Sequence, residues 1–267
     1  MSKVILITGG SSGIGLSIGK YLQTKGYKIY GTSRNPAKFE NHPFPLLPLS
    51  MNDAVSMKKT LDHLLDLEGA IDILINNAGT GIAGPLEETP IEAIKENFQT
   101  NFFGPIELIQ KILPTMRKQK KGLIINITSI AGYMGLPYRG AYSANKGAFE
   151  LASEAIRMEV KSFGIEIVTI APGDYATAIS SRRYHAPLLE DSPYRKTYEA
   201  NLALMNNHVG SGNDPIEVAK QVYKVIQKKS PKVHYKVGAF MQKFSVVLKT
   251  ILPDKVFEKL IMKHYGL

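Results

Sequence analysis

The sequence contains no cysteine in its 267 residues. It therefore has no disulfide framework and no metal site built on thiolates, and a reducing compartment is compatible with it. No stretch approaches the roughly 20 consecutive apolar residues that span a bilayer. The apolar run Val4–Ile7 near the first residue is too short for a signal peptide. The six histidines are scattered without ligand spacing, so no metal site is expected. These absences predict a cytoplasmic protein.

Acidic residues are scarce in one region. The chain has 33 Lys and Arg against 23 Asp and Glu, a net charge of +10. Residues 220–267 hold eleven lysines and two acidic residues, so 11 − 2 = +9 of that charge lies there. Such a segment would attract anionic lipid headgroups or an acidic partner; a solvated, lysine-rich face explains it equally well. Arginine is absent from the segment and no aromatic-plus-basic motif occurs, so nucleic acid is not an expected partner.

Short apolar runs alternate with segments of helical periodicity along the chain. The composition, 44% hydrophobic and 21% charged, is that of an ordinary globular protein. The runs typical of strands are 4–7, 27–31, 71–75, 123–128, 165–170 and 234–237. The segments of helical character are 14–25, 53–67, 91–116 (with Pro105 as a kink or break), 142–163, 214–228, 240–251 and 256–261. This alternation predicts an α/β fold with a doubly wound parallel sheet, in one domain over 1–267.

Two segments depart from the alternation. Residues 173–213 have no strong period, and they follow a strand at its carboxyl end. We therefore expect them to lie over the crevice there as a substrate lid. Residues 238–267 are interpreted as a basic helical tail. That tail would rest on a membrane surface, pack over the active site or contact another subunit, and each explanation fits its apolar faces.

Tyr142 and Lys146 are the first candidate catalytic residues. A spacing of four places them on one face of a helix, a turn apart. Free tyrosine titrates near ~10, which is too high for proton transfer at neutral pH. An adjacent ammonium stabilises the phenolate and lowers the tyrosine pKa, making Tyr142 an acid or base near pH 7. Ser129, upstream, would hold a carbonyl or alcohol oxygen against the phenol. The pair alone is also typical of a solvated helix edge.

Gly9, Gly13 and Gly15 lie between the first expected strand and the first expected helix. A dinucleotide diphosphate needs a tight turn, close backbone approach without Cβ atoms, and free N–H groups at a helix N-terminus. The spacing is Gly-x3-Gly-x-Gly rather than the commoner Gly-x-Gly-x-x-Gly. The position directly after the first strand favours a dinucleotide site.

The end of the second expected strand bears on the choice between NAD and NADP. An acidic residue there binds the ribose hydroxyls, whereas an arginine accommodates the 2′-phosphate. This chain has Arg34 there and no acidic residue until Glu40. We therefore predict a preference for NADP(H) over NAD(H), with Ser33 assisting. A plain surface arginine is the alternative.

The order of these motifs resembles that of the short-chain dehydrogenase/reductase family, over nearly the whole chain. The matching segments are Thr8–Gly15, Asn76–Gly79, Asn101 in Thr-Asn-Phe-Phe-Gly, Ser129, Tyr142, Lys146, Pro172–Gly173 and Thr177. One such motif would be a weak signal, but five in the right order are a strong one. The tail is similar to that of the hydroxysteroid and retinol dehydrogenase-like branch. The resemblance implies a Rossmann fold and a nicotinamide cofactor.

The resemblance also implies a catalytic set of Asn101, Ser129, Tyr142 and Lys146. Tyr142 would give a proton to the carbonyl oxygen as hydride arrives from the nicotinamide, or take it in the reverse direction. Lys146 would lower the Tyr142 pKa and bond the nicotinamide ribose. Ser129 would orient the substrate oxygen, and Asn101 would hold a water that relays protons to Lys146. Two structural alternatives stay open: Asn101 bonding a helix backbone, and Asn76 tying neighbouring strands together.

The cofactor site follows from the glycine turn, Arg34 and the resemblance. It comprises Gly9, Ser11, Ser12, Gly13, Ile14, Gly15, Ser33, Arg34, Met51, Asn77, Ala78, Gly79, Tyr142, Lys146, Pro172, Gly173 and Thr177. Within it, Thr177 would bond the nicotinamide carboxamide. Ser12 stands where NADP-using relatives often carry a basic residue, and Ser50, before Met51, stands where the family often has an aspartate. Both departures would loosen cofactor binding.

The substrate side is predicted to be apolar. The expected lining is Ile130, Tyr133, Met134, Leu136, Tyr138, Tyr175, Ile179, Tyr184 and Leu188. It favours a lipophilic carbonyl or alcohol, although simple packing of loop aromatics explains the same residues. The predicted function is thus an NADP(H)-dependent oxidoreductase. The alternatives are an NADPH-binding sensor without turnover and a reductase of small polar carbonyls. The resemblance further implies a homo-oligomer built on helices 91–116 and 142–163.

Overall fold

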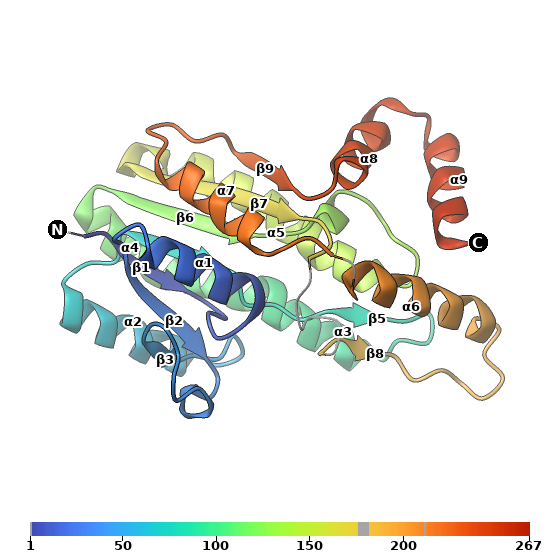
Figure 1. Ribbon diagram of the computed structural model, residues 1–267, viewed down its shortest axis with the longest axis horizontal. Helices are drawn as coiled ribbons and strands as arrows, with labels where there is room; N and C mark the ends of the chain where they lie inside the picture. Colours follow the sequence, from blue (N-terminus) through green and yellow to red (C-terminus); the bar gives the residue numbers. More distant parts are fainter. Residues whose placement is uncertain (1, 176–181, 211) are drawn as a thin grey trace.

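The chain folds around one parallel sheet (Figure 1). The computed structural model describes residues 2–175, 182–210 and 212–267. Within these ranges the sheet has seven strands in the order β3-β2-β1-β4-β6-β7-β9, and neighbouring strands are parallel throughout. The strands are β1 (Val4–Ile7), β2 (Lys28–Ser33), β3 (Leu46–Pro48), β4 (Ile73–Asn76), β6 (Gly122–Ile127), β7 (Ile165–Pro172) and β9 (His234–Val237). The expected doubly wound sheet is confirmed.

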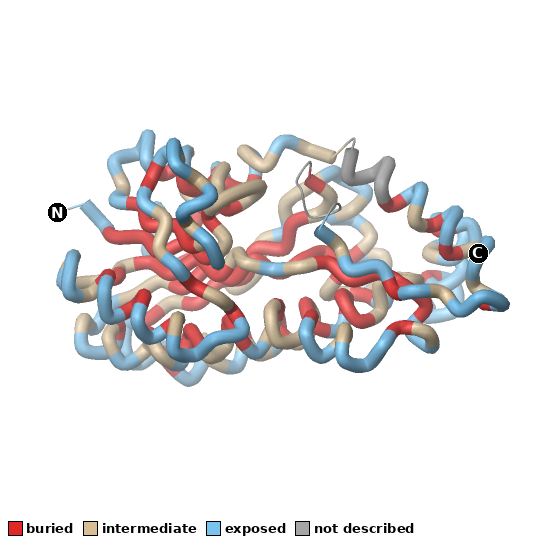
Figure 2. The backbone as a smooth tube through the Cα atoms, turned by 90° about the horizontal axis from the view of Figure 1, so that it is seen from below, coloured by how far each residue is buried: buried red, intermediate tan, exposed pale blue. Residues whose placement is uncertain are grey.

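Helices cover both faces of the sheet because successive strand residues point to opposite faces. Leu6 packs in one apolar layer with Met57 and Phe149, whereas its neighbour Ile5 packs in the other layer with Ile18. Figure 2 shows the buried residues concentrated along the strands between these layers. The helices are α1 (Gly13–Gln23), α2 (Ala54–Glu68), α3 (Ile91–Phe98), α4 (Gly104–Gln119), α5 (Gly140–Val160), α6 (Arg195–Gly210), α7 (Ile216–Ile226), α8 (Phe240–Ile251) and α9 (Asp254–Tyr265).

Strand β1 marks the point where the strand order reverses. It pairs with β2 on one side and with β4 on the other. The chain therefore crosses to opposite halves of the sheet on either side of β1. In open α/β sheets the crevice outside the carboxyl ends of the strands at such a point is the usual ligand site.

The predicted helix 91–116 is interrupted in the structure. α3 ends at Phe98, a π-helical turn, η2 (Gln99–Phe103), follows, and α4 begins at Gly104. Pro105 is the second residue of α4 and has no N–H to donate back to a carbonyl of η2. The chain does not break at Pro105 as one of the two expectations had it; the irregularity is a π-helical turn just before the proline.

The interpretation of 173–213 as irregular was wrong for part of that segment. It contains the helix α6 and the two-residue strand β8 (Tyr184–His185), which pairs with β5 (Ile82–Ala83). The face of α6 that is buried carries Tyr198, Asn201 and Met205. A polar asparagine in the middle of this stripe hides its apolar period.

The tail packs beside the carboxyl end of β7. In α8, the Gln242 side chain donates to the Asp174 carboxylate over 2.8 Å. Val246 and Phe257 pack against Ile130 and Met134. Ile130 begins the short helical turn η3 (Ile130–Tyr133), and Met134 directly follows it. In the described part of the chain, no helix combines the length and apolar character needed to cross a membrane.

Candidate active site

A cavity of about 780 Å³ lies in the crevice at the carboxyl ends of the strands. Its lining includes Gly9, Ser11, Ser12, Gly13, Ile14, Ser33, Arg34, Met51, Asn77, Ala78, Gly79, Ser129, Tyr142, Lys146, Pro172 and Gly173. Two further predicted residues, Gly15 and Asn101, are absent from this lining, and Thr177 lies outside the described residues. The structure thus gathers most predicted cofactor and catalytic positions around one space.

The glycine turn has the geometry that a diphosphate needs. Gly9 and Gly13 have φ values of 63° and 54°, which favour glycine. A Cβ atom on Gly15 would lie 2.4 Å from the Gly9 carbonyl oxygen and 2.5 Å from Asn77 Nδ2. Gly15 does not line the cavity; its missing side chain lets the start of α1 pack closely against Gly9 and Asn77. The free N–H groups at the start of α1 face the space in front.

Polar side chains hold the turn to the next strand. Asn77 Nδ2 donates to the carbonyl oxygens of Thr8 (2.9 Å) and Gly9 (3.2 Å). The Thr8 hydroxyl accepts from the backbone N–H of Asn77 in return. One residue earlier, Asn76 donates to Asn126 Oδ1 over 2.9 Å and ties β4 to β6. The alternative that Asn76 ties neighbouring strands together is thus confirmed.

Cations surround the end of the cavity near β2. Arg34 lines it together with Lys38, which sequence reasoning did not single out. Arg182 reaches the same cavity from the segment before β8, and its Nη1 donates to the Ser12 hydroxyl over 3.3 Å. A positive charge therefore stands beside Ser12 although position 12 itself is neutral. No local pattern could reveal this, since the two residues are 170 positions apart.

Ser129 and Tyr142 meet because η3 packs closely on α5. A Cβ atom on Gly132 would lie 2.9 Å from the Lys146 carbonyl carbon, so only glycine permits this approach. The Ser129 hydroxyl hydrogen-bonds the Tyr142 phenol and also accepts from the Ala131 N–H over 3.2 Å. A phenol and a hydroxyl thus converge at one point of the cavity wall.

The prediction that the pKa of Tyr142 is lowered was wrong. Burial raises the pKa of this phenol, because the phenolate loses its hydration. The positive charges of Arg139 and Arg183 oppose this effect of burial, and so does the hydrogen bond to Ser129. Burial also lowers the pKa of Lys146, to about 8. Its Nζ donates to the Ile127 carbonyl over 3.1 Å.

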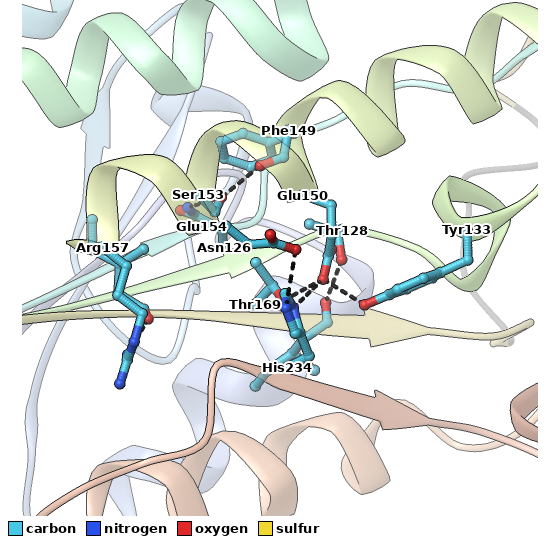
Figure 3. A network of polar contacts seen from close by, with 12 residues as sticks. Asn126, Thr128, Tyr133, Phe149, Glu150, Ser153, Glu154, Arg157, Thr169 and His234 are labelled. Carbon is cyan, nitrogen blue, oxygen red and sulfur yellow. Dashed lines mark hydrogen bonds and ion pairs between the residues drawn. The ribbon is translucent and has the colours of Figure 1, made fainter. Parts of the chain in front are cut away.

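Behind Lys146 lies a buried polar network that sequence reasoning missed (Figure 3). Glu150, one helical turn after Lys146, accepts hydrogen bonds through Oε1 from Tyr133, Thr169 and His234. His234 Nε2 reaches the Glu154 carboxylate, 3.1 Å away and nearer the surface. The Glu150 charge raises the pKa of Lys146 against the effect of burial. The spacing of four on one helix face was the available signal.

Asn101 lies buried in the π-helical turn η2. Its Oδ1 accepts from the Thr80 N–H and its Nδ2 donates to the Thr80 carbonyl, both over 2.8 Å. It therefore clamps the loop after β4, rather than a helix backbone. A Cβ atom on Gly79 would lie 3.0 Å from Asn101 Oδ1 and 3.6 Å from Lys146 Nζ, so both side chains lie close to Gly79. The water relay stays a prediction.

The predicted apolar lining was wrong for most of its residues. Tyr175 lines the cavity, but Ile130, Tyr133, Met134, Leu136, Tyr138, Tyr184 and Leu188 do not; Ile179 lies outside the described residues. Ile130 and Met134 turn instead toward the tail, which covers them. Arg139, Asp174 and Arg183 take their place in the wall. Tyr142 therefore has charged groups beside it in the cavity wall as well as the apolar side chains of Ile82 and Leu136 packed against it.

Comparison with known proteins now identifies the family. A family model described as short chain dehydrogenase matches residues 3–187. The chain belongs to the short-chain dehydrogenase family. A 3-ketodihydrosphingosine reductase of Bacteroides thetaiotaomicron is 35% identical, over 99% of this chain and 98% of that protein. An uncharacterized oxidoreductase of Bacillus subtilis, YusZ, is 31% identical, with 98% of each covered.

Solved structures agree with this membership. The crystal structure of a short-chain dehydrogenase from Streptomyces avermitilis superposes with a TM-score of 0.82 and 26% identity, covering 100% of this chain and 96% of that one. The resemblance seen in the sequence is thereby confirmed. This short-chain dehydrogenase is an oxidoreductase enzyme of the kind that acts on small molecules with CH–OH or carbonyl groups.

Proposed function

We propose that this protein is an NADP(H)-dependent oxidoreductase that interconverts a carbonyl and an alcohol, with Tyr142 as the acid or base. The observation that carries the proposal is that one cavity is lined by both the glycine turn and the catalytic residues Ser129, Tyr142 and Lys146. A sensor without turnover would need the turn but not the buried phenol and amine. The intact catalytic set therefore argues against that alternative.

The residues present fit a nicotinamide dinucleotide. The positive φ of Gly9 and Gly13 and the close approach at Gly15 leave space for a diphosphate in front of α1. When bound, the nicotinamide supplies or accepts the hydride. The Tyr142 hydroxyl gives its proton to the carbonyl oxygen, which the Ser129 hydroxyl orients. The positive charges of Arg139 and Arg183 stabilise the phenolate that remains.

A preference for NADP(H) is supported by charge. Arg34 and Lys38 line the cavity, and Arg182 lies at Ser12. No acidic residue lines the described part of this cavity end, so nothing there is placed to select ribose hydroxyls over a 2′-phosphate. Arginine and lysine together suit a phosphate dianion.

Two observations support a lipophilic substrate. The curated relative at 35% identity is by name a reductase of a ketosphingoid. A second cavity, of about 530 Å³, lies between the loop before Arg139 and the tail; its lining includes Leu136, Pro137, Phe257, Ile261 and Met262 beside Lys249, Asp254 and Glu258. It shares no lining residue with the first cavity, and we propose that its apolar part receives the far end of a long alkyl chain.

Turnover tests the proposal. Purified protein should oxidise NADPH when offered aldehydes and ketones of increasing alkyl chain length, and kcat/KM should rise with that length. Tyr142→Phe should lower kcat by about 10³-fold or more, since proton transfer is lost, while the Kd for NADPH stays nearly the same. NADPH binding without oxidation of any carbonyl would identify a sensor instead. Equal use of short, polar carbonyls would favour the polar alternative.

We further propose that the tail rests on an anionic lipid surface at the cytoplasmic face of a membrane. Phe240, Met241 and Ile251 of α8 are exposed, and Lys243 and Lys249 lie on the same helix. Apolar side chains flanked by lysines match the headgroup region of such a bilayer. Phe240→Ser/Met241→Ser should reduce sedimentation with phosphatidylserine vesicles, whereas Leu67→Ser, an exposed apolar residue of α2, should not. Equal sedimentation of both variants would exclude the contact.

We also propose that the protein is a homo-oligomer. Leu151 and Met158, seven residues apart on α5, are both exposed, and Phe103 is exposed just before α4. A second copy packed on these helices would cover them. Light scattering coupled to gel filtration should show a homodimer or tetramer that Leu151→Glu/Met158→Glu converts to a monomer. A monomeric parent protein would contradict this proposal.

A further inference from the structure

Two arginines line the substrate side of the catalytic cavity. Arg139 and Arg183 share that lining with Tyr142 and Ser129. The Arg139 guanidinium carbon lies 5.2 Å from the centre of the Tyr142 ring. The positive charge of each arginine acts to lower the pKa of the Tyr142 phenol. These charges have no role in holding the diphosphate, because they lie at the catalytic end of the cavity.

Secondary structure fixes the place of Arg183. It directly precedes β8, whose Tyr184 N–H donates to the Gly81 carbonyl over 3.0 Å. Its side chain crosses Gly81, where an added Cβ atom would lie 3.1 Å from Arg183 Cγ. The adjacent Arg182 turns the other way, toward Ser12 at the start of α1. Neighbouring arginines thus serve opposite ends of the cavity.

The tail fixes the place of Arg139. This residue precedes α5, and its side chain hydrogen-bonds the hydroxyl of Tyr265, which is buried at the end of α9. Tyr265 also feels the charges of Arg183 and Asp174. Burial raises the pKa of Tyr265, so its hydroxyl keeps the proton and can act as a donor. The guanidinium groups of Arg139 and Arg183 and the phenol of Tyr265 therefore lie near one another, in what we call the arginine corner.

The arginine corner carries excess positive charge. Two arginines stand against the single carboxylate of Asp174, 2 − 1 = +1, and that carboxylate also accepts from Gln242 over 2.8 Å. The Arg139 charge acts against that of Arg183, so the like charges repel. An arginine remains protonated even so. An added oxyanion would relieve the repulsion and accept from planar donors suited to it.

We propose that Arg139 and Arg183 form a subsite for an oxyanion of the substrate, a carboxylate or a phosphate, close to the carbonyl that is reduced, and that the Tyr265 hydroxyl, behind the cavity lining, positions Arg139. This proposal rests on the proposed function and narrows its substrate class. The substrate is an oxo compound whose acidic group lies at the arginines and whose remaining part extends away from them. A neutral carbonyl compound leaves the repulsion in place and binds less well.

Matched substrates test the subsite. NADPH oxidation would be followed with 4-formylbenzoate, its neutral methyl ester and 4-formylphenyl phosphate. For the wild-type protein, kcat/KM should be at least about tenfold higher for an anionic aldehyde than for the ester. Arg139→Gln and Arg183→Gln should each reduce this ratio roughly ten- to a hundredfold. The better of the two anions identifies the oxyanion. Arg195→Gln, which removes an exposed arginine of α6, should keep the wild-type ratio.

Binding without turnover separates the two proposals. With saturating NADPH, benzoate and phenyl phosphate should raise the Tm of the wild-type protein and of Arg195→Gln, but not that of Arg139→Gln or Arg183→Gln. Anion binding without reduction of any aldehyde would remove the proposed function and keep the subsite. Reduction of the ester with no preference for the anions, and no Tm shift, would remove the subsite and keep the function. NADPH binding by each variant would verify that it is folded.

Discussion

The two ends of the catalytic cavity are built in different ways. The cofactor end consists of short contiguous segments directly after strands, such as Thr8–Gly15 after β1 and Asn76–Gly79 at the end of β4. The substrate end takes Arg139 and Arg183 from two distant segments, and Tyr265 of the tail contacts Arg139 from behind the lining. The first end depends on backbone geometry, which a local motif specifies. The second depends on side chains that meet only through tertiary packing.

This contrast explains where charge is placed. At the cofactor end, glycines remove Cβ atoms so that backbone N–H groups face the ligand. At the substrate end, long side chains reach in from the segment before β8 and from the loop before α5. A substitution of a glycine in the turn should therefore weaken cofactor binding alone. Loss of an arginine charge at the substrate end should alter substrate preference alone.

The largest expected effect breaks the cofactor end. Gly15→Ala places a methyl group 2.4 Å from the Gly9 carbonyl and 2.5 Å from Asn77 Nδ2, so the turn must shift. We expect the Kd for NADPH to rise on the order of a hundredfold, with stability lowered by roughly 1–3 kcal/mol. Titration of NADPH fluorescence measures the affinity. Gly135→Ala is the control, because an added Cβ there meets nothing within 4 Å. Unchanged NADPH affinity in Gly15→Ala would separate the turn from cofactor binding.

A smaller effect sharpens cofactor choice. Arg34→Gln removes one exposed cation from the cavity end near β2, and Lys38 remains. We expect the preference for NADPH over NADH, measured as a ratio of kcat/KM values, to fall about tenfold, since an exposed charge is partly screened. Arg117→Gln, which lies in α4 away from this cavity, should leave the ratio unaltered. A ratio insensitive to Arg34 would mean that Arg182 binds the phosphate.

The pH profile tests the network behind Lys146. Lys146 loses its charge as the pH rises through about 8, and the Glu150 carboxylate raises that pKa. Glu150→Gln removes the raising charge but keeps an acceptor for Tyr133, Thr169 and His234. The alkaline limb of the kcat/KM profile should therefore move to lower pH. Glu154→Gln, at the outer side of His234, is the matched control and should move it less. A shift to higher pH would contradict the assigned sign.

The smallest expected effect concerns the tail. Tyr265→Phe deletes one hydroxyl at the arginine corner and keeps the ring buried at the end of α9. We expect a few-fold loss of preference for anionic over neutral aldehydes, as one neutral hydrogen bond contributes about 1 kcal/mol. Comparing kcat/KM for the matched aldehydes measures it. A loss as large for the neutral ester would indicate general damage to the site.

Much of the fold and the cofactor end could be predicted from the sequence. The run Val4–Ile7 and the glycines after it specify a buried strand, a turn and a helix start by local rules. The buried stripe of α6 could not be predicted, because Asn201 interrupts it. Nor could the charged groups beside Tyr142, because residues near it in sequence, such as Met134, point toward the tail. Local patterns do not say which distant segment covers a loop.

The π-helical turn η2 (Gln99–Phe103) also limits how the chain length can vary. A turn of this kind contains one residue more than an ordinary α-helical turn. Deleting a single residue there would let α3 and α4 join in one continuous helix. Every residue on one side would then rotate by roughly 100° about the axis relative to the other. Asn101 would leave the loop that it clamps, so a shorter chain at this point would keep its helix and lose the two hydrogen bonds between Asn101 and Thr80.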